Sequence, residues 1–296
     1  MKKFISIVAA VLVAVCMFTF VACNPVNNEE GFDATKKITV ITRADGSGTK
    51  SAFMEIVGLK NQPDVGGVIK AADTAAVLSG VQSNKYAIAF DSLGYVVGKS
   101  GITVLTVDSV APTASTIKDG SYPIARPLSV VYKPETLSNE LYKAYYDFLL
   151  SSDSQAIVAA EGYTSNYDNA SAYNVNAALS GEIALTGSTS LQPLMTKLAE
   201  KFEQLQPKVT VTVGGTGSSQ GYNDAKNGVS PFGMISEVFV QSKAENCTST
   251  VVALDGIAII VNSQNTLKNI TKDQLKHIYG NVEGETQLTA WEQLAE

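Results

Sequence analysis

The sequence predicts an α/β fold made of two units, and three features of the chain point to it. Short runs of β-branched residues alternate with amphipathic segments of helical period from Lys37 onward. A strand, a Gly/Ser-rich turn and a helix follow one another in both halves of the chain. The 296 residues, of which 45% are hydrophobic, are enough to build two buried cores.

The first 23 residues have the pattern of an export leader. Two lysines precede an apolar run from Phe4 to Phe20, and the small residue Ala22 stands before Cys23. This pattern resembles a lipoprotein signal in which Cys23 is the cleavage point and carries the lipid, although Phe20 stands where Leu is usual. An uncleaved membrane anchor is the alternative. Both readings put the rest of the chain outside the cytoplasm, on the cell membrane.

The composition removes several classes of function. The chain has 22 Lys and Arg residues against 28 Asp and Glu residues, so nothing favours binding to nucleic acid. Cys16 and Cys23 belong to the leader, which leaves Cys247 alone and excludes an intramolecular disulfide or a cysteine metal site. No cluster of His or Cys residues offers a metal site or a catalytic base. We therefore predict no catalytic residue, no metal and no cofactor.

The first strand–turn–helix unit carries the strongest motif. Residues 38–42 form the predicted strand, and a helix begins near Lys50. Between them lies the run Arg-Ala-Asp-Gly-Ser-Gly-Thr at residues 43–49. Its arginine can contact two oxygens of an oxyanion at once, its hydroxyls are donors, and its glycines let the backbone approach closely. A surface turn with an incidental arginine is the alternative for this segment alone.

Each side chain of this run has an expected role. Arg43, Ser47, Gly48 and Thr49 are the candidate anion-binding residues. Asp45 is expected to hold the guanidinium of the arginine in place.

The middle of the chain continues the α/β pattern and then breaks. Strands are predicted at 102–105 and 128–132, and one long helix at 139–160. Residues 161–181 are polar and rich in Asn, Ser and Ala, which predicts a linker.

A new unit follows the linker and repeats the first arrangement. Strands are predicted at 183–185 and 209–213, with a helix at 194–205. Hydroxyl-rich turns at 187–190 and 214–221 stand where helices begin, and a helix start favours an anion. Either turn alone is weak evidence, but three such turns in one exported chain predict a shared anion site.

These residues resemble the phosphate-binding proteins of bacterial ABC phosphate transporters, which have the two-lobed periplasmic binding protein fold of type II. The run at 43–49 is similar to that family's signature. Thr189 and Ser190 fall in a Gly-Ser-Thr-Ser-Leu-x-Pro-Leu segment, and Ser218 in a Gly-x-Gly-Ser-Ser turn. The resemblance implies that Thr189, Ser190 and Ser218 bind the anion, with Ser188 in support. The match continues through 122–124, 162–163, 255–262, 275–280 and Trp291. The resemblance implies a carrier that binds inorganic phosphate, delivers it to permease subunits and is a monomer.

The order of the segments departs from the family. There the Gly-Ser-Thr-Ser half comes first, whereas here the arginine motif follows the leader, so the chain looks circularly permuted. A linker such as 164–180 could join the original ends. A truncated or recombined gene product is the alternative.

A second departure lies at residues 233–237. The family often has an Asp here, beside a Ser, which accepts the proton that phosphate still carries and so rejects sulfate. Glu237, with Ser236 donating beside it, is the candidate for that role. A plain surface acid is the alternative for Glu237.

The predicted organisation is a signal peptide at 1–23 and two lobes. One lobe comprises 36–122 plus 264–296 and carries the arginine motif, and the other comprises 123–263 and carries the two hydroxyl-rich turns. We expect the anion between them. Three rivals remain: a binder of sulfate, molybdate or tungstate, a phosphatase or phosphotransferase, and a permuted remnant that no longer binds.

Overall fold

The computed structural model describes residues 31–294. The predicted signal peptide, with the expected lipidation site Cys23, lies outside the described residues. No helix within the described range is long and apolar enough to span a membrane.

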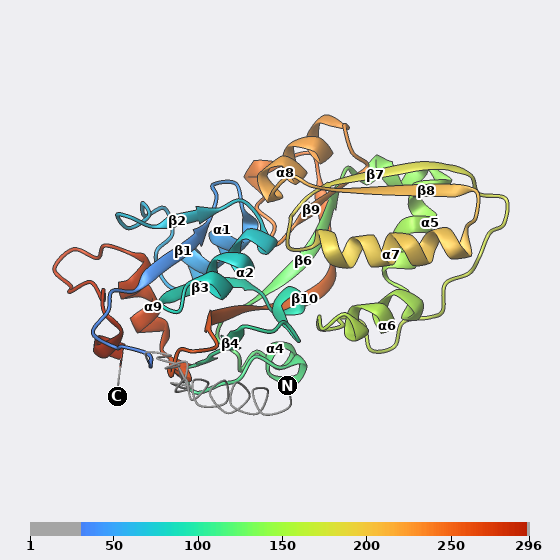
Figure 1. The fold of residues 1–296 in the computed structure, drawn as a ribbon. Helices are drawn as coiled ribbons and strands as arrows, with labels where there is room; N and C mark the ends of the chain where they lie inside the picture. The colour runs from blue at the N-terminus through green and yellow to red at the C-terminus, as the bar shows by residue number, and fades with distance from the viewer. Residues whose placement is uncertain (1–30, 295–296) are drawn as a thin grey trace, which may run out of the picture. The chain divides into compact units, whose positions relative to one another are not determined.

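A mixed β-sheet is the frame of the described residues (Figure 1). Its order is β2-β1-β3-β10-β6-β9-β7-β8, and β4 pairs separately with β10. A small second sheet pairs β5 with β11. The strands are β1 (Thr39–Arg43), β2 (Ile69–Ala71), β3 (Ala87–Ser92), β4 (Ile102–Val104), β5 (Thr106–Val107), β6 (Ala125–Tyr132), β7 (Gly181–Gly187), β8 (Val209–Gly215), β9 (Phe232–Ile235), β10 (Thr248–Asn262) and β11 (Asn269–Ile270).

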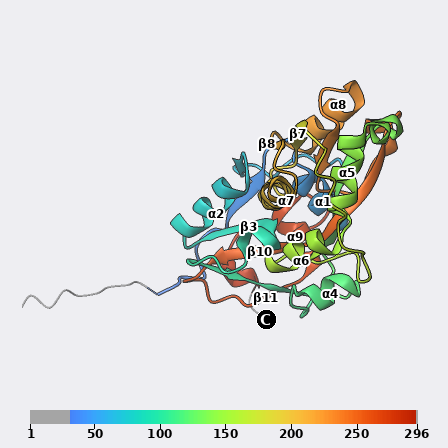
Figure 2. The same cartoon turned by 90° about the vertical axis from the view of Figure 1, so that its right-hand side faces the viewer.

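Helices pack on both halves of this sheet. Helix α2 contacts β1, β3 and β10, whereas α7 lies against β8, as its end-on view in Figure 2 makes clear. The α-helices are α1 (Gly48–Ile56), α2 (Thr74–Ser83), α3 (Leu93–Val96), α4 (Ala114–Lys118), α5 (Glu140–Leu149), α6 (Ser152–Ala160), α7 (Gln192–Leu205), α8 (Ser218–Asn227) and α9 (Lys272–Tyr279). Short 3₁₀ helices are η1 (Pro134–Ser138), η2 (Gln241–Lys243) and η3 (Trp291–Leu294).

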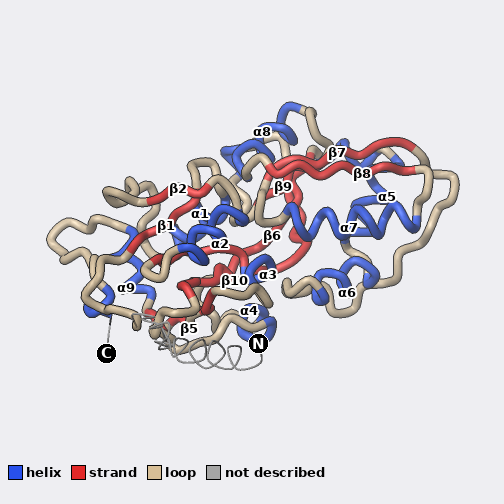
Figure 3. The backbone as a smooth tube through the Cα atoms, viewed as in Figure 1, coloured by secondary structure: helices blue, strands red, loops and turns tan. Residues whose placement is uncertain are grey.

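The buried apolar side chains gather in two large clusters. The first runs from Ile41 to Ile124 and again from Ile257 to Leu294, and we call this part the arginine lobe. The second lies between Leu128 and Ala253, and we call it the serine lobe. Strands β6 and β10 pair antiparallel and belong to both, so the two lobes share a continuous sheet (Figure 3). This is a two-lobed α/β fold.

The strands predicted from β-branched runs are confirmed, but the predicted helix at 139–160 is two helices. α5 ends at Leu149, and the side chain of Ser151 caps α6 by accepting from the N–H of Ser154 at 3.3 Å. The same hydroxyl donates to the carbonyl of Phe148 at 2.7 Å. A serine that bonds to nearby backbone groups competes with helix continuation, which explains the break.

Candidate functional site

The arginine motif occupies the junction between a central strand and a helix. β1 pairs in parallel with β2 and β3 and ends at Arg43, whose side chain is fully buried. The chain then turns, and α1 begins at Gly48. Ser47 is the N-cap of α1, and its hydroxyl accepts from the N–H of Lys50 at 3.4 Å. The first N–H groups of α1 have no helix carbonyl to bond, so this end of the helix suits an anion.

The guanidinium of Arg43 connects the two lobes. Its Nη2 donates to the hydroxyl of Thr189 in the serine lobe at 2.5 Å and to the carbonyl of Ala72 at 3.5 Å. Its Nη1 lies 3.5 Å from a carboxylate oxygen of Asp91. Nε of Arg43 and Oδ2 of Asp91 have no hydrogen-bond partner among the described residues. A buried guanidinium with so few short bonds has donors left for a ligand.

Two more side chains meet across the same junction. The hydroxyls of Thr49 in α1 and Ser190 in the serine lobe are 2.8 Å apart, and both residues are buried. The turn that carries Thr189 and Ser190 is held by Ser188, whose hydroxyl accepts from the N–H groups of Ser190 at 3.2 Å and Leu191 at 3.1 Å. Ser188 therefore shapes the turn, and its neighbours face the other lobe.

The third turn completes the cluster at the start of α8. The hydroxyls of Ser218 and Ser236 are 3.3 Å apart, and the N–H of Ser236 donates to Ser218 at 3.2 Å. Gly48 packs so closely on this pair that a Cβ at its position would collide with Ser218 and lie 2.9 Å from the hydroxyl of Ser236. The N–H of Ser219 also donates to the carbonyl of Gly46 at 3.1 Å. The two lobes are in contact around these hydroxyls.

A second buried arginine lies close to the first. Arg126 of β6 donates through Nη2 to Asp255 of β10 at 2.9 Å and through Nη1 to the carbonyl of Ser236 at 2.9 Å. Burial raises the pKa of Asp91 to about 6, although Arg43 opposes the shift, and burial also raises the pKa of Asp255. Burial lowers the pKa of Arg43. The two arginines and two aspartates nearly balance each other's charge.

The structure thus brings together eight of the nine predicted anion-binding residues, and the ninth, Glu237, lies beside them with its carboxylate bound to Lys243. The eight are Arg43, Ser47, Gly48, Thr49, Thr189, Ser190, Ser218 and Ser236. The carboxylate of Glu237 pairs with Lys243 at 2.7 Å. It lines a cavity of about 310 Å³ with Gly46, Ser47 and Lys50, beside the hydroxyl cluster.

The expectation for Asp45 needs correction. Its side chain is 75% exposed and pairs with Lys50 at 2.6 Å and Lys70 at 3.1 Å. The ammonium groups of Lys50 and Lys70 bind this exposed carboxylate, so it turns away from the guanidinium. Asp91 contacts Arg43 in its place.

Sequence reasoning missed Asp91, Arg126 and Asp255. One signal for Asp91 was present in the sequence: it is the only acid in the largely apolar run at residues 87–92. In the structure these six residues form a strand and all are buried. A charge in such a strand is expected to have a partner. Tyr163, which donates to the carbonyl of Ser190 at 3.3 Å, was also missed as a support of the turn.

The cluster presents several hydroxyl groups beside a buried guanidinium. Among the described residues, none of these hydroxyls donates to a carboxylate or an imidazole. The described residues also contain no group of three or more His, Cys, Asp or Glu side chains that could hold a metal ion. Buried donors around a guanidinium suit an oxyanion.

Comparisons with known proteins agree on the family. The model of the PBP superfamily domain matches residues 27–153 and 172–296. A "Phosphate-binding protein PstS 2" of Streptococcus agalactiae is 33% identical over 278 residues, which cover 91% of this chain and 92% of that protein. The crystal structure of a phosphate-binding protein of a phosphate ABC transporter from Streptococcus pneumoniae superposes with a TM-score of 0.71 and 30% identity. It covers 88% of this chain and 100% of that one.

The order of segments is shared with these relatives. "Phosphate-binding protein PstS 2" of Streptococcus pneumoniae is 31% identical over 299 residues, which cover 99% of each chain, so both halves align in the same order. The Bacillus subtilis protein "Phosphate-binding protein PstS" is 34% identical over 125 residues, which cover 41% of this chain and 40% of that protein. The alternative of a chance recombination in this chain loses its support. The chain belongs to the PBP superfamily and, within it, to the family of the PstS phosphate-binding proteins.

Proposed function

We propose that this chain is an extracytoplasmic solute-binding protein that captures inorganic phosphate between its lobes and delivers it to an ABC import permease. The observation that carries the proposal is the buried guanidinium of Arg43, which reaches Thr189 of the other lobe at 2.5 Å. Relatives that span nearly the whole chain are named for binding phosphate. The permease partner is inferred from the transporter named for the pneumococcal structure.

In this proposal the anion is bound mainly by hydrogen bonds. Arg43 supplies charged donors, and the N-terminal end of α1 at Gly48 and Thr49 supplies backbone N–H groups. The hydroxyls of Ser47, Thr189, Ser190, Ser218 and Ser236 add neutral donors. Because Asp91 already compensates the charge of Arg43, the site does not neutralise the ligand fully. A carrier benefits from this balance, since its ligand must also leave.

Selectivity between oxyanions requires an acceptor for the proton that phosphate carries and sulfate lacks. We infer that Asp91 is better suited to this role than Glu237. Asp91 touches Arg43 and has one oxygen without a partner, whereas Glu237 is held by Lys243. If neither carboxylate contacts the ligand, binding of sulfate, molybdate or tungstate becomes the better reading.

The cellular location of the protein is proposed from the leader pattern at residues 1–23. Cleavage and lipidation at Cys23 would anchor the chain to the outer face of the membrane. We also propose that the protein is a monomer, as the resemblance to this family of carriers implies. We propose no enzymatic activity, because within residues 31–294 none of the site hydroxyls donates to an activating base.

The decisive experiment is calorimetric titration of the leaderless protein, stripped of bound anion, with phosphate and then with sulfate at neutral and mildly alkaline pH. Tight binding of phosphate without sulfate heat is the expected result. Preference for sulfate or molybdate would change the substrate. A folded protein that binds none of these anions would support the reading as a remnant without a working site, and release of phosphate from a phosphomonoester would support an enzyme.

A further inference from the structure

The chain uses arginine at only two positions, and both are buried beside each other. Of its 22 Lys and Arg residues, Arg43 and Arg126 alone are arginines, and each side chain is 1% exposed. Burial lowers the pKa of Arg43, and the positive charge of Arg126 acts in the same direction. A guanidinium offers several donors in one plane, which an ammonium does not. An arginine at position 126 therefore points to a task that needs more than a charge.

Arg126 stands where the chain crosses between the lobes. It lies on β6 directly opposite Asp255 of β10, and these two strands are the ones that both lobes share. Its Nε and Nη2 donate to one carboxylate oxygen of Asp255 at 3.2 Å and 2.9 Å. The other oxygen of Asp255 accepts from the N–H of Gly94 at 3.4 Å. The guanidinium is thus held in one orientation on the shared strands.

The remaining terminal nitrogen of Arg126 reaches the anion cluster. Its Nη1 donates to the carbonyl of Ser236 at 2.9 Å. The N–H of Ser236 donates to the hydroxyl of Ser218 at 3.2 Å. The backbone of Ser236 is therefore held on one side by the shared strands and on the other by the start of α8. This arrangement fixes the direction in which the hydroxyl of Ser236 points.

A role in stability alone does not account for this geometry. Neutralising Asp255 requires only a cation beside it, and Nε and Nη2 of Arg126 already do this. The bond to Ser236 is made by the nitrogen that the carboxylate does not engage. It connects the charge pair on the shared strands with a residue of the anion site.

We propose that Arg126 is a positioning residue of the anion site. It holds the carbonyl of Ser236 in place relative to the strands that join the lobes, so that the hydroxyl of Ser236 faces the bound anion. Arg126 acts through Ser236 rather than by touching the anion. The inference rests on the proposed function, because it takes this hydroxyl as a donor to the ligand.

Arg126→Lys tests the contact. A lysine keeps a cation beside Asp255, but one ammonium on a flexible stem does not hold the carboxylate and the carbonyl of Ser236 in the same fixed geometry. Phosphate affinity of the leaderless protein, measured by calorimetric titration, is expected to fall about five- to tenfold, as for the loss of one hydrogen bond. Wild-type affinity in a folded Arg126→Lys protein overturns the proposal.

A double-mutant cycle with Ser236→Ala separates positioning from a purely structural effect. If Arg126 acts through the hydroxyl of Ser236, Arg126→Lys should change affinity less than about twofold once that hydroxyl is absent. An equal loss in both backgrounds overturns the proposal. Ser230→Ala is the matched control, because Ser230 precedes the same strand, β9, and its hydroxyl donates to the carbonyls of Ala184 and Phe232 instead. In that background the full loss should remain.

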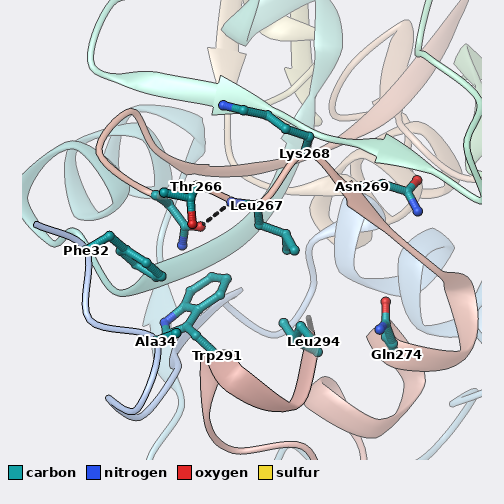
Figure 4. A pocket seen from close by; sticks show the side chains of 10 residues that line it. Phe32, Ala34, Thr266, Leu267, Lys268, Asn269, Gln274, Trp291 and Leu294 are labelled. Atoms are coloured by element: carbon teal, nitrogen blue, oxygen red, sulfur yellow. Dashed lines mark hydrogen bonds between the residues drawn. The ribbon is translucent and has the colours of Figure 1, made fainter. Parts of the chain in front are cut away.

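Folding of each variant is followed at a distance from the site. Trp291 is the only tryptophan of the chain, and it lines a cavity of the arginine lobe, beside Phe32, that shares no lining residue with the anion cluster (Figure 4). Its emission and circular dichroism report whether the variant is folded. If Arg126→Lys is not, Arg126→Gln combined with Asp255→Asn removes both buried charges together. This double variant must show the same dependence on Ser236.

Titration of the wild type distinguishes this proposal from the proposed function. If the wild type binds phosphate and Arg126→Lys binds it equally well, the positioning role alone is overturned. If the wild type binds sulfate or molybdate instead, the ligand changes and the same cycle with that anion decides the role of Arg126. A wild type that binds none of these anions overturns both proposals.

Discussion

Asp91 and Arg43 form a buried ion pair on neighbouring strands, with 3.5 Å between a carboxylate oxygen and Nη1. Both side chains are almost without contact to solvent. The pair is long for a charged hydrogen bond, so each partner keeps bonding capacity for another group. A buried arginine left without a counter-charge would be costly, which makes Asp91 a condition for keeping Arg43 at the site.

The first prediction concerns stability against pH. The folded-state pKa of Asp91 is raised from 3.8 to about 6, so ionising it costs more in the folded than in the unfolded chain. Its contribution to stability is present below about pH 3.8 and is lost as the pH rises through about 6. Asp91→Asn should remove this loss. Melting temperatures in phosphate-free buffer are then expected to fall less steeply between these pH values in the variant than in the wild type.

Asp45→Asn is the control for this experiment. Hydrogen bonds from Lys50 and Lys70 lower the pKa of Asp45, so its shift has the opposite sign and its side chain is exposed. A parallel pH profile for Asp91→Asn and the wild type would contradict the prediction.

The second prediction concerns the parallel N–H donors of the Arg43 guanidinium. Arg43→Lys keeps the charge beside Asp91 but cannot offer two parallel donors. Hydrogen bonds to charged groups contribute about 1.5–3 kcal/mol each, so phosphate affinity should fall at least about tenfold. Calorimetric titration measures this, with circular dichroism to establish folding. Wild-type affinity in a folded Arg43→Lys protein would remove Arg43 from the site.

The third prediction separates the two candidate acceptors. Asp91→Asn should make sulfate binding measurable and weaken phosphate, because an amide can donate to a fully deprotonated anion. Glu237→Gln should leave the preference unchanged, since Lys243 already holds that carboxylate. Competition titrations with both anions give the ratio of affinities. Selectivity lost in Glu237→Gln and kept in Asp91→Asn would reverse the assignment.

Much of this architecture follows from local sequence pattern. The run around Arg43 and the turns at Thr189 and Ser218 predicted three strand–helix junctions, because glycine, hydroxyl residues and strand periodicity act within a few residues of one another. The structure has a junction at each of these places.

The charged partners around Arg43 could not be predicted from local sequence pattern. Asp91 and Asp255 lie 48 and 212 positions from Arg43 in the chain, and pairing of strands brings them near it. Asp45 was the candidate partner of Arg43 because it is close in the sequence, but Lys50 and Lys70 bind it. Adjacency in the sequence favours a contact only where burial leaves no competing partner.

The fourth prediction tests the contact between lobes. Thr49→Val and Ser190→Ala each remove one hydroxyl of the pair that lies 2.8 Å apart. A double-mutant cycle on phosphate affinity should give a coupling of about 0.5–1.5 kcal/mol, as for a neutral hydrogen bond. Thr49→Val combined with Thr250→Val, whose hydroxyl bonds Tyr132 instead, should be additive. Additivity in the first cycle would mean that the two hydroxyls do not act together when phosphate is bound.

The fifth prediction uses the close approach at Gly48. A methyl group there would collide with the side chain of Ser218 and press on the hydroxyl of Ser236, so Gly48→Ala should keep the lobes apart at this point. Phosphate affinity is expected to fall at least about tenfold, by the same arithmetic as for a lost charged hydrogen bond. The melting temperature of the ligand-free protein should change little, because Gly48 belongs to neither apolar core.

Gly66→Ala is the matched control, because its added methyl group would meet no atom within 4 Å. It should bind phosphate like the wild type. A Gly48→Ala protein with unchanged affinity would show that the serine turn does not close on the start of α1 when the anion binds. In that case the ligand would have to be held by Arg43 and Thr189 without the close contact between Gly48 and the third turn.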